Sequence, residues 1–141
     1  MAARNVVVDA GPIIASLVAG DERHAWTSEQ LSRLRPPLLT CEAALSEAAF
    51  VVKRLGGDPA AVPMLVEAGV LGIAFSVQDQ AAHLRALMRR YAQVPMSLTD
   101  ACLVRMTELI DDAVVLTFDS DFRVYRKQGR KVIALLAPEG V

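Results

Sequence analysis

The feature that most constrains the fold is a series of short, unbroken apolar runs that alternate with longer stretches of helical periodicity. The strand-like runs lie at about 4–9, 38–40, 70–76, 113–118 and 131–136. The helical stretches lie at about 11–19, 25–34, 42–55, 58–68, 79–92 and 98–110. Continuous apolar strands are typical of parallel sheets that helices cover on both faces. We therefore predict an α/β fold, a three-layer sandwich with a mainly parallel central sheet.

Length and composition agree with one domain spanning residues 1–141. The chain is 53% apolar but only 5% aromatic, so aliphatic side chains must build its core. Its two cysteines, Cys41 and Cys102, show no Cys/His ligand spacing, which argues against a zinc site or a disulfide framework. Because the longest apolar runs are too short to span a bilayer, we expect a cytoplasmic protein with no membrane partner.

Acidic residues follow two of the predicted strands. Asp9 ends the first apolar run, and Asp119 follows the run that begins at residue 113. Ligands of parallel α/β sheets bind beyond the carboxyl ends of the strands. The negative charge of Asp9 could also simply stabilise the N-terminus of the next helix. Asp121 is close to Asp119, and we assign the capping of the turn to Asp121 and the pocket to Asp119.

Two further acids lie in predicted helices. Glu47 has apolar residues three and four places away on both sides, so we expect it to face the core: Ala43, Ala44, Phe50 and Val51. A buried acid must be paired with a cation such as arginine or bound to a metal. Glu42 falls in the first turn of that helix, where the helix dipole explains it.

Asp100 has two compatible interpretations. Ser97-Leu98-Thr99-Asp100 matches the capping box, in which the acid accepts from a backbone N–H at the helix start. Leu103 and Val104 lie on the same helix face, so the carboxylate also turns toward the core. If these acids converge, they need a cation to stay ionised together. Oxygen ligands without Cys or His indicate Mg²⁺ or Mn²⁺ and phosphoryl-transfer chemistry.

Four segments in this order resemble the PIN-domain ribonucleases found as VapC-type toxins of toxin–antitoxin pairs. They are Val8–Pro12, Thr40–Glu47, Pro95–Ala101 and Thr117–Phe122, and the resemblance covers nearly all of the chain. It implies an Mg²⁺- or Mn²⁺-dependent endoribonuclease, a hydrolase whose metal ligands and catalytic residues are Asp9, Glu47, Asp100 and Asp119. Asp121 could share or replace the role of Asp119. It also implies an RNA substrate, a homodimer, a small antitoxin partner and a supporting hydrogen bond from Thr117.

A basic stretch follows the last acids: Arg123, Arg126, Lys127, Arg130 and Lys131, with Tyr125 among them. It could contact RNA phosphates, although a solvated connection between elements is the usual interpretation of such a run. Arg85, Arg89 and Arg90 read as an exposed helix face. We interpret His24 and His83 as structural or surface residues.

Other functions remain open at this point. A Mg²⁺-binding receiver domain would carry adjacent acids after its first strand and a lysine after its last strand. A phosphatase of the haloacid-dehalogenase type would have Asp-x-Asp at the first strand end, where residue 11 is glycine. A dinucleotide-binding fold would have a glycine-rich turn after the first strand, and this sequence has none there. A PIN fold retained only to bind another protein is the non-catalytic alternative, and the presence of all four acids weighs against it.

Overall fold

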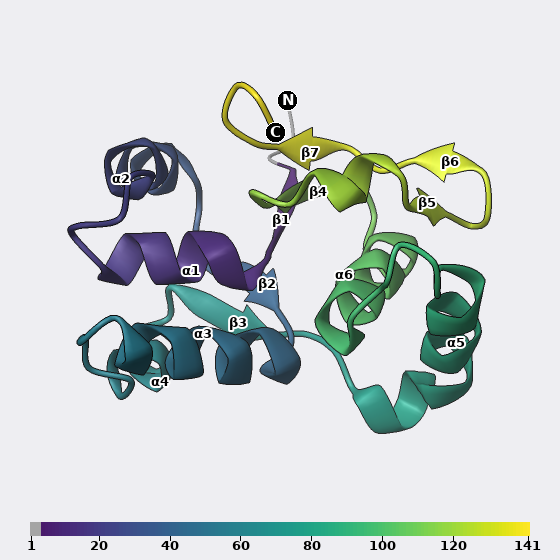
Figure 1. Ribbon diagram of the computed structural model, residues 1–141, viewed down its shortest axis with the longest axis horizontal. Helices are drawn as coiled ribbons and strands as arrows, with labels where there is room; N and C mark the ends of the chain where they lie inside the picture. The colour runs from purple at the N-terminus through teal and green to yellow at the C-terminus, as the bar shows by residue number, and fades with distance from the viewer. Residues whose placement is uncertain (1–3) are drawn as a thin grey trace.

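A sheet of five parallel strands forms the centre of the molecule in the computed structural model, which describes residues 4–141 (Figure 1). The spatial order is β3-β2-β1-β4-β7, and every neighbouring pair is parallel. The strands are β1 (Asn5–Val8), β2 (Leu38–Thr40), β3 (Leu71–Ile73), β4 (Ala113–Leu116) and β7 (Leu135–Leu136). The predicted α/β architecture with a parallel sheet is therefore confirmed.

Helices cover both faces of this sheet. They are α1 (Ala10–Leu17), α2 (His24–Arg33), α3 (Glu42–Arg54), α4 (Ala61–Glu67), α5 (Val77–Arg90) and α6 (Leu98–Leu109). In Figure 1, α5 and α6 lie to the right of the strands, and α1, α2 and α4 lie to the left. This arrangement buries both faces of the sheet, as continuous apolar strands require.

Two apolar clusters occupy the two faces, and the alternation of β1 divides its side chains between them. Val7 packs with Val115 and the residues of α5 and α6. Val6 and Val8 point the other way, into the cluster formed with α1, α3 and α4. Strands β1 and β4 are thus the buried centre of the sheet.

Two strand predictions were wrong in extent. The run at 131–136 is split into β6 (Lys131–Val132), which pairs antiparallel with β5 (Arg126–Lys127), and β7, which pairs parallel with β4. The run is interrupted at residues 133–134, and its two ends belong to different sheets. The run at 70–76 ends at Ile73, because Ser76 caps α5 by accepting the N–H of Asp79 at 3.2 Å.

The predicted domain of residues 1–141 extends over residues 1–3, which lie outside the described part of the chain. Both apolar clusters pack on the one central sheet, which agrees with a single domain. In the part that the structure describes, no helix is both long and apolar enough to cross a membrane.

Candidate active site

An acidic cleft opens where the order of the sheet reverses. From β1 the chain adds β2 and β3 on one side, and later adds β4 and β7 on the other. Such a reversal leaves a crevice beyond the carboxyl ends of the two central strands. The cleft has a volume of about 560 Å³, and its lining residues are Asp9, Gly11, Glu47, Pro95, Ser97, Asp100, Phe118, Asp119 and Asp121. All five candidate acids therefore face one space, including Asp121, which was expected to cap the turn.

Asp9 is held at the junction of β1 and α1. It caps α1, with Oδ1 accepting the N–H of Ala10 at 2.7 Å, while Oδ2 accepts the hydroxyl of Thr117 at 2.8 Å. Only 8% of the residue is exposed. Burial raises the pKa of Asp9 to about 6, and the charges of Asp100 and Glu47 add to the rise against these two hydrogen bonds. Capping and cleft roles coexist in this residue.

Thr117 connects the ends of the two central strands. It is fully buried directly after β4, and it donates to Asp9 across 108 residues of sequence. Its Oγ1 also accepts the N–H of Asp119 at 3.0 Å. The hydroxyl of Thr117 therefore orients both the carboxylate of Asp9 and the backbone at Asp119. This agrees with the supporting hydrogen bond predicted for Thr117.

Asp100 begins α6 in the capping box that the sequence predicted. Its N–H donates to Ser97 Oγ at 3.0 Å, and its Oδ2 accepts the N–H of Ser97 at 3.3 Å. The same Oδ2 accepts the hydroxyl of Tyr125 at 2.9 Å. Burial raises the pKa of Asp100, as does the charge of Asp119, whereas the bonds from Tyr125 and Ser97 oppose the rise.

Tyr125, which lies within the basic stretch in the sequence, supports the site from the core. Its side chain is fully buried, with the rings of Tyr91 and Phe122 edge-on at 5.1 and 5.2 Å. Burial and the bond to Asp100 raise its pKa, so the hydroxyl keeps its proton and donates. Sequence reasoning missed this role because no local pattern links residues 100 and 125.

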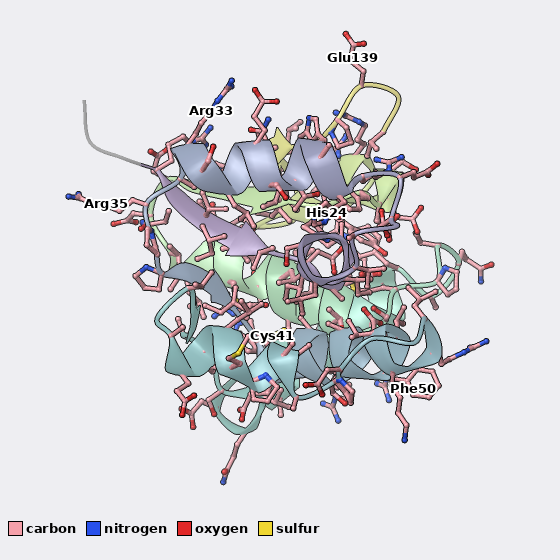
Figure 2. The ribbon with its side chains drawn as sticks, turned by 90° about the vertical axis from the view of Figure 1, so that its left-hand side faces the viewer. His24, Arg33, Arg35, Cys41, Phe50 and Glu139 are labelled. Carbon is pink, nitrogen blue, oxygen red and sulfur yellow. The ribbon has the colours of Figure 1, made fainter. Side chains whose placement is uncertain are left out.

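Glu47 lies in the cleft, but the prediction that it is buried was wrong. The buried face of α3 follows Ala44, Ala48 and Val52, and Glu47 is exposed. Phe50, one of the apolar neighbours that suggested burial, is 62% exposed and projects outward in Figure 2. Partial desolvation raises the pKa of Glu47, and the charges of Asp100 and Asp119 raise it further.

The predicted roles of Asp119 and Asp121 are not divided as expected. Asp119 is the residue that caps the 3₁₀ helix η1 (Ser120–Arg123), with Oδ1 accepting the N–H of Asp121 at 2.9 Å. Assigning the cap to Asp121 was therefore wrong. Both acids line the cleft and both are half-buried. Asp121 thus remains an alternative to Asp119 as the fourth ligand.

The carboxylates of the cleft have no basic partner. Lys, Arg and His are absent from its lining, and within residues 4–141 none of its five acids forms a salt bridge. Arg23 instead packs over the ring of Phe118, 4.8 Å from its centroid. In the described chain, no three His, Cys, Asp or Glu side chains are already arranged to hold a metal ion. The donor chemistry of these carboxylate oxygens fits a hard cation.

Gly11 and Phe118 form an apolar wall that sequence reasoning did not identify. A Cβ at Gly11 would lie 3.0 Å from Cδ2 of Phe118, so a larger residue would require the ring to shift by a few tenths of an ångström. The ring also packs edge-on against Trp26, with centroids 5.9 Å apart. Glycine after the first acid was visible in the sequence, but its contact with residue 118 depends on the pairing of β1 with β4.

The histidines lie outside the lining of the cleft, as predicted. Nδ1 of His24 contacts the carbonyl oxygen of Ala15 at 2.6 Å, which connects the start of α2 to α1. His83 is exposed on α5. Neither residue is therefore placed to act on a ligand in the cleft.

Comparisons with known proteins match this chain to a protein family and to solved structures. Residues 6–128 match the family model described as the PIN domain. Among solved structures, the chain is similar to the crystal structure of Mycobacterium tuberculosis VapC20, a sarcin-ricin loop cleaving toxin. That match has a TM-score of 0.73 and 21% sequence identity, and it covers 85% of this chain and 94% of the other. A search of curated proteins found no match.

Proposed function

We propose that this chain, which belongs to the PIN domain family, is a metal-dependent endoribonuclease that hydrolyses RNA phosphodiester bonds. The observation that carries the proposal is the cleft, where five carboxylates from four separate segments meet without a basic partner. Such a cluster is costly unless a cation neutralises it. The raised pKa values of Asp9, Glu47 and Asp100 express that cost.

The residues that would hold Mg²⁺ or Mn²⁺ are Asp9, Glu47, Asp100 and Asp119, with Asp121 as the alternative to Asp119. Their donors are all oxygens, which both ions accept. A bound ion of this kind would activate water and stabilise the leaving oxygen of the phosphodiester. Glu47 is exposed, and no hydrogen bond from residues 4–141 restrains its carboxylate. Its side chain is therefore free to move toward the other acids.

The chain itself orients the two buried acids. Thr117 and the N–H of Ala10 each donate to one oxygen of Asp9. Both donors to Asp100 use Oδ2, and within the described residues none reaches its Oδ1. Because Oδ1 has no such donor, it is available to a ligand. Preorganised carboxylates of this kind reduce the reorganisation that binding and catalysis require.

We further propose that the protein is the toxin of a VapBC-type pair, acting in the cytoplasm as one nuclease domain and as a homodimer. The support is the similarity in fold to the toxin VapC20 over 94% of that chain. A small antitoxin would then be its partner. Induced expression of the wild type should arrest bacterial growth, whereas Asp100→Asn should not. Growth arrest by both proteins would argue against toxicity through this site.

The test of the nuclease is cleavage of total cellular RNA by the purified protein with Mg²⁺ or Mn²⁺. Discrete products are expected, and they should disappear with EDTA or in Asp100→Asn. Asparagine keeps an acceptor for the N–H of Ser97, so the cap of α6 should survive. If folded, metal-binding protein cleaves none of the RNAs, the endoribonuclease proposal is overturned in favour of the non-catalytic binding module.

A further inference from the structure

Two segments of the chain are basic and contain no acid. Residues 84–99 carry Arg85, Arg89 and Arg90, and residues 122–138 carry five cations. From sequence alone, the first is expected to be an exposed helix face, and the second either contacts RNA phosphates or is a solvated connection between elements. Their nearest cations, Arg90 and Arg123, are more than thirty positions apart in sequence.

The structure brings these two segments together. The guanidinium of Arg90, at the end of α5, donates through Nη2 to the carbonyl oxygen of Gly129 at 2.8 Å. The hydroxyl of Tyr91 accepts the N–H of Arg126 at 3.0 Å. Gly129 lies in the turn between β5 and β6, and Figure 1 shows this hairpin on the same side of the molecule as α5. A helix end and a hairpin therefore form one surface.

The charges on that surface are available to a ligand. We call it the basic surface, and it consists of Arg85, Arg89, Lys127, Arg130 and Lys131. Four of these side chains belong to exposed residues, Lys127 is half-buried, and within residues 4–141 none forms a salt bridge. Lys127 and Lys131 are opposite each other in the hairpin.

Neighbouring acidic groups do not neutralise the positive charge of the basic surface. Glu108 accepts the N–H of Gln128 in the hairpin turn, but it is already paired with Arg105 at 3.1 Å. Arg126 donates to the carbonyl oxygens of residues 123–125, and Arg123 donates to that of Val141. These two arginines are therefore engaged with backbone carbonyl oxygens and are left out of the basic surface.

The basic surface lies close to the acidic cleft. Tyr125, which precedes the hairpin, donates its hydroxyl to Asp100, and its ring packs against Tyr91 at 5.1 Å. From Tyr91 the chain runs to Pro95 and Ser97, both of which line the cleft. A polymer that occupies the cleft therefore passes near the basic surface.

We propose that the basic surface binds the sugar-phosphate backbone of single-stranded RNA next to the bond that is cleaved, an inference that rests on the proposed ribonuclease. An acidic cleft repels a polyanion, so cations outside it must supply the binding energy. Phosphate contacts of this kind position the RNA without reading its sequence. They also release counterions, so the affinity depends steeply on salt.

The experiment measures binding of a fluorescein-labelled single-stranded RNA by anisotropy, in EDTA and over a series of KCl concentrations. The test variant is Arg89→Gln/Arg130→Gln. The matched control, Arg33→Gln/Arg35→Gln, loses the same charge on the side shown in Figure 2, where both arginines project from the surface. A second test variant, Arg85→Gln/Lys131→Gln, is used if the first does not fold. Circular dichroism checks the fold of each protein.

The slope of log K against log[KCl] should be smaller in the test variant by about 1.4, because each lost phosphate contact on a single strand contributes about 0.7. Affinity at low salt should fall at least roughly tenfold, while the control keeps the wild-type slope. An equal slope in wild type and in the test variant that folds, an equal loss in the control, or no RNA binding by the wild type would overturn the inference. Cleavage is measured separately with metal, so failure of the nuclease proposal is distinguishable.

Discussion

The hydroxyl of Tyr125 donates a hydrogen bond of 2.9 Å to Oδ2 of Asp100, from a side chain that is itself fully buried. The ring of Tyr125 belongs to the cluster that packs α5 and α6 against the sheet. A carboxylate of the cleft is therefore held by the apolar core as well as by its own helix cap.

Tyr125→Phe removes this donor and keeps the aromatic packing. Because the lost bond lowers the pKa of Asp100, that pKa should rise further and the acidic limb of the pH–rate profile should move to higher pH. Loss of a bond to a charged group should also cost about 1–3 kcal/mol of unfolding free energy. The control is Tyr91→Phe, since the Tyr91 hydroxyl bonds to the N–H of Arg126 instead. An acidic limb that stays in place would contradict the role.

Glu47→Gln should reduce RNA cleavage by at least roughly 100-fold, because it removes an oxygen donor to the proposed metal. The fold should be unaffected, since exposed substitutions change stability by about 0.5 kcal/mol or less. Loss of its repulsion with Asp100 and Asp119 should act in the stabilising direction. Glu42→Gln, on an exposed residue of the same helix, is the matched control for both measurements. If Glu47→Gln cleaves RNA as fast as the wild type does, Glu47 is not a functional residue of the site.

The titration of Asp9 should make the metal-free protein less stable as pH rises. The pKa of Asp9 increases from 3.8 to about 6 on folding, so between these values the folded state binds more protons than the unfolded state. Stability is then lost as pH rises through this window, by up to about 3 kcal/mol. This loss should be smaller in Asp9→Asn, which keeps an N-cap acceptor and cannot titrate.

Urea unfolding in EDTA from about pH 4 to pH 8 measures this difference. Asp9→Asn should exceed the wild type in stability mainly toward the upper end, since pH 4 lies at the lower edge of the window and most of the loss occurs above it. If the free energy of unfolding changes equally with pH in the two proteins, the pKa of Asp9 is not raised.

Mg²⁺ or Mn²⁺ should raise the melting temperature, because a bound cation relieves repulsion that exists only in the folded state. At about 100 times the dissociation constant the gain is roughly 2.7 kcal/mol, which for a chain of this length corresponds to roughly 5–10 °C. Calorimetry with K⁺ at matched ionic strength is the control. The shift should vanish in Asp9→Asn/Asp100→Asn, and an equal shift in that variant would place the metal elsewhere.

Sequence pattern was sufficient for the sheet and for most of the site. The apolar runs near Val7 and Val115 could be buried only between two layers of helices, and parallel strands bring their carboxyl ends to one edge. Asp9 and Asp119 had to meet there for that reason. The capping box at Ser97 and Asp100 is a local motif, and local hydrogen bonds formed it as predicted.

The burial of individual side chains and the long-range contacts could not be predicted from sequence in the same way. Helix α3 is apolar on several faces, so periodicity could not decide that Ala44, Ala48 and Val52 turn inward while Glu47 and Phe50 do not. That choice depends on which layers pack against the helix. The division of the final apolar run likewise depends on its partners, β5 for one end and β4 for the other.

By itself, the sequence determined the strand-and-helix order, the buried centre of the sheet and the acids at its carboxyl edge, because these follow from periodicity and from the geometry of parallel strands. Only the tertiary structure decided that Thr117 holds Asp9, that Tyr125 holds Asp100 and that Arg90 joins α5 to the hairpin turn at Gly129. Those contacts join residues 25 to 108 positions apart, and their partners are selected by the packing of whole elements, which no local pattern encodes.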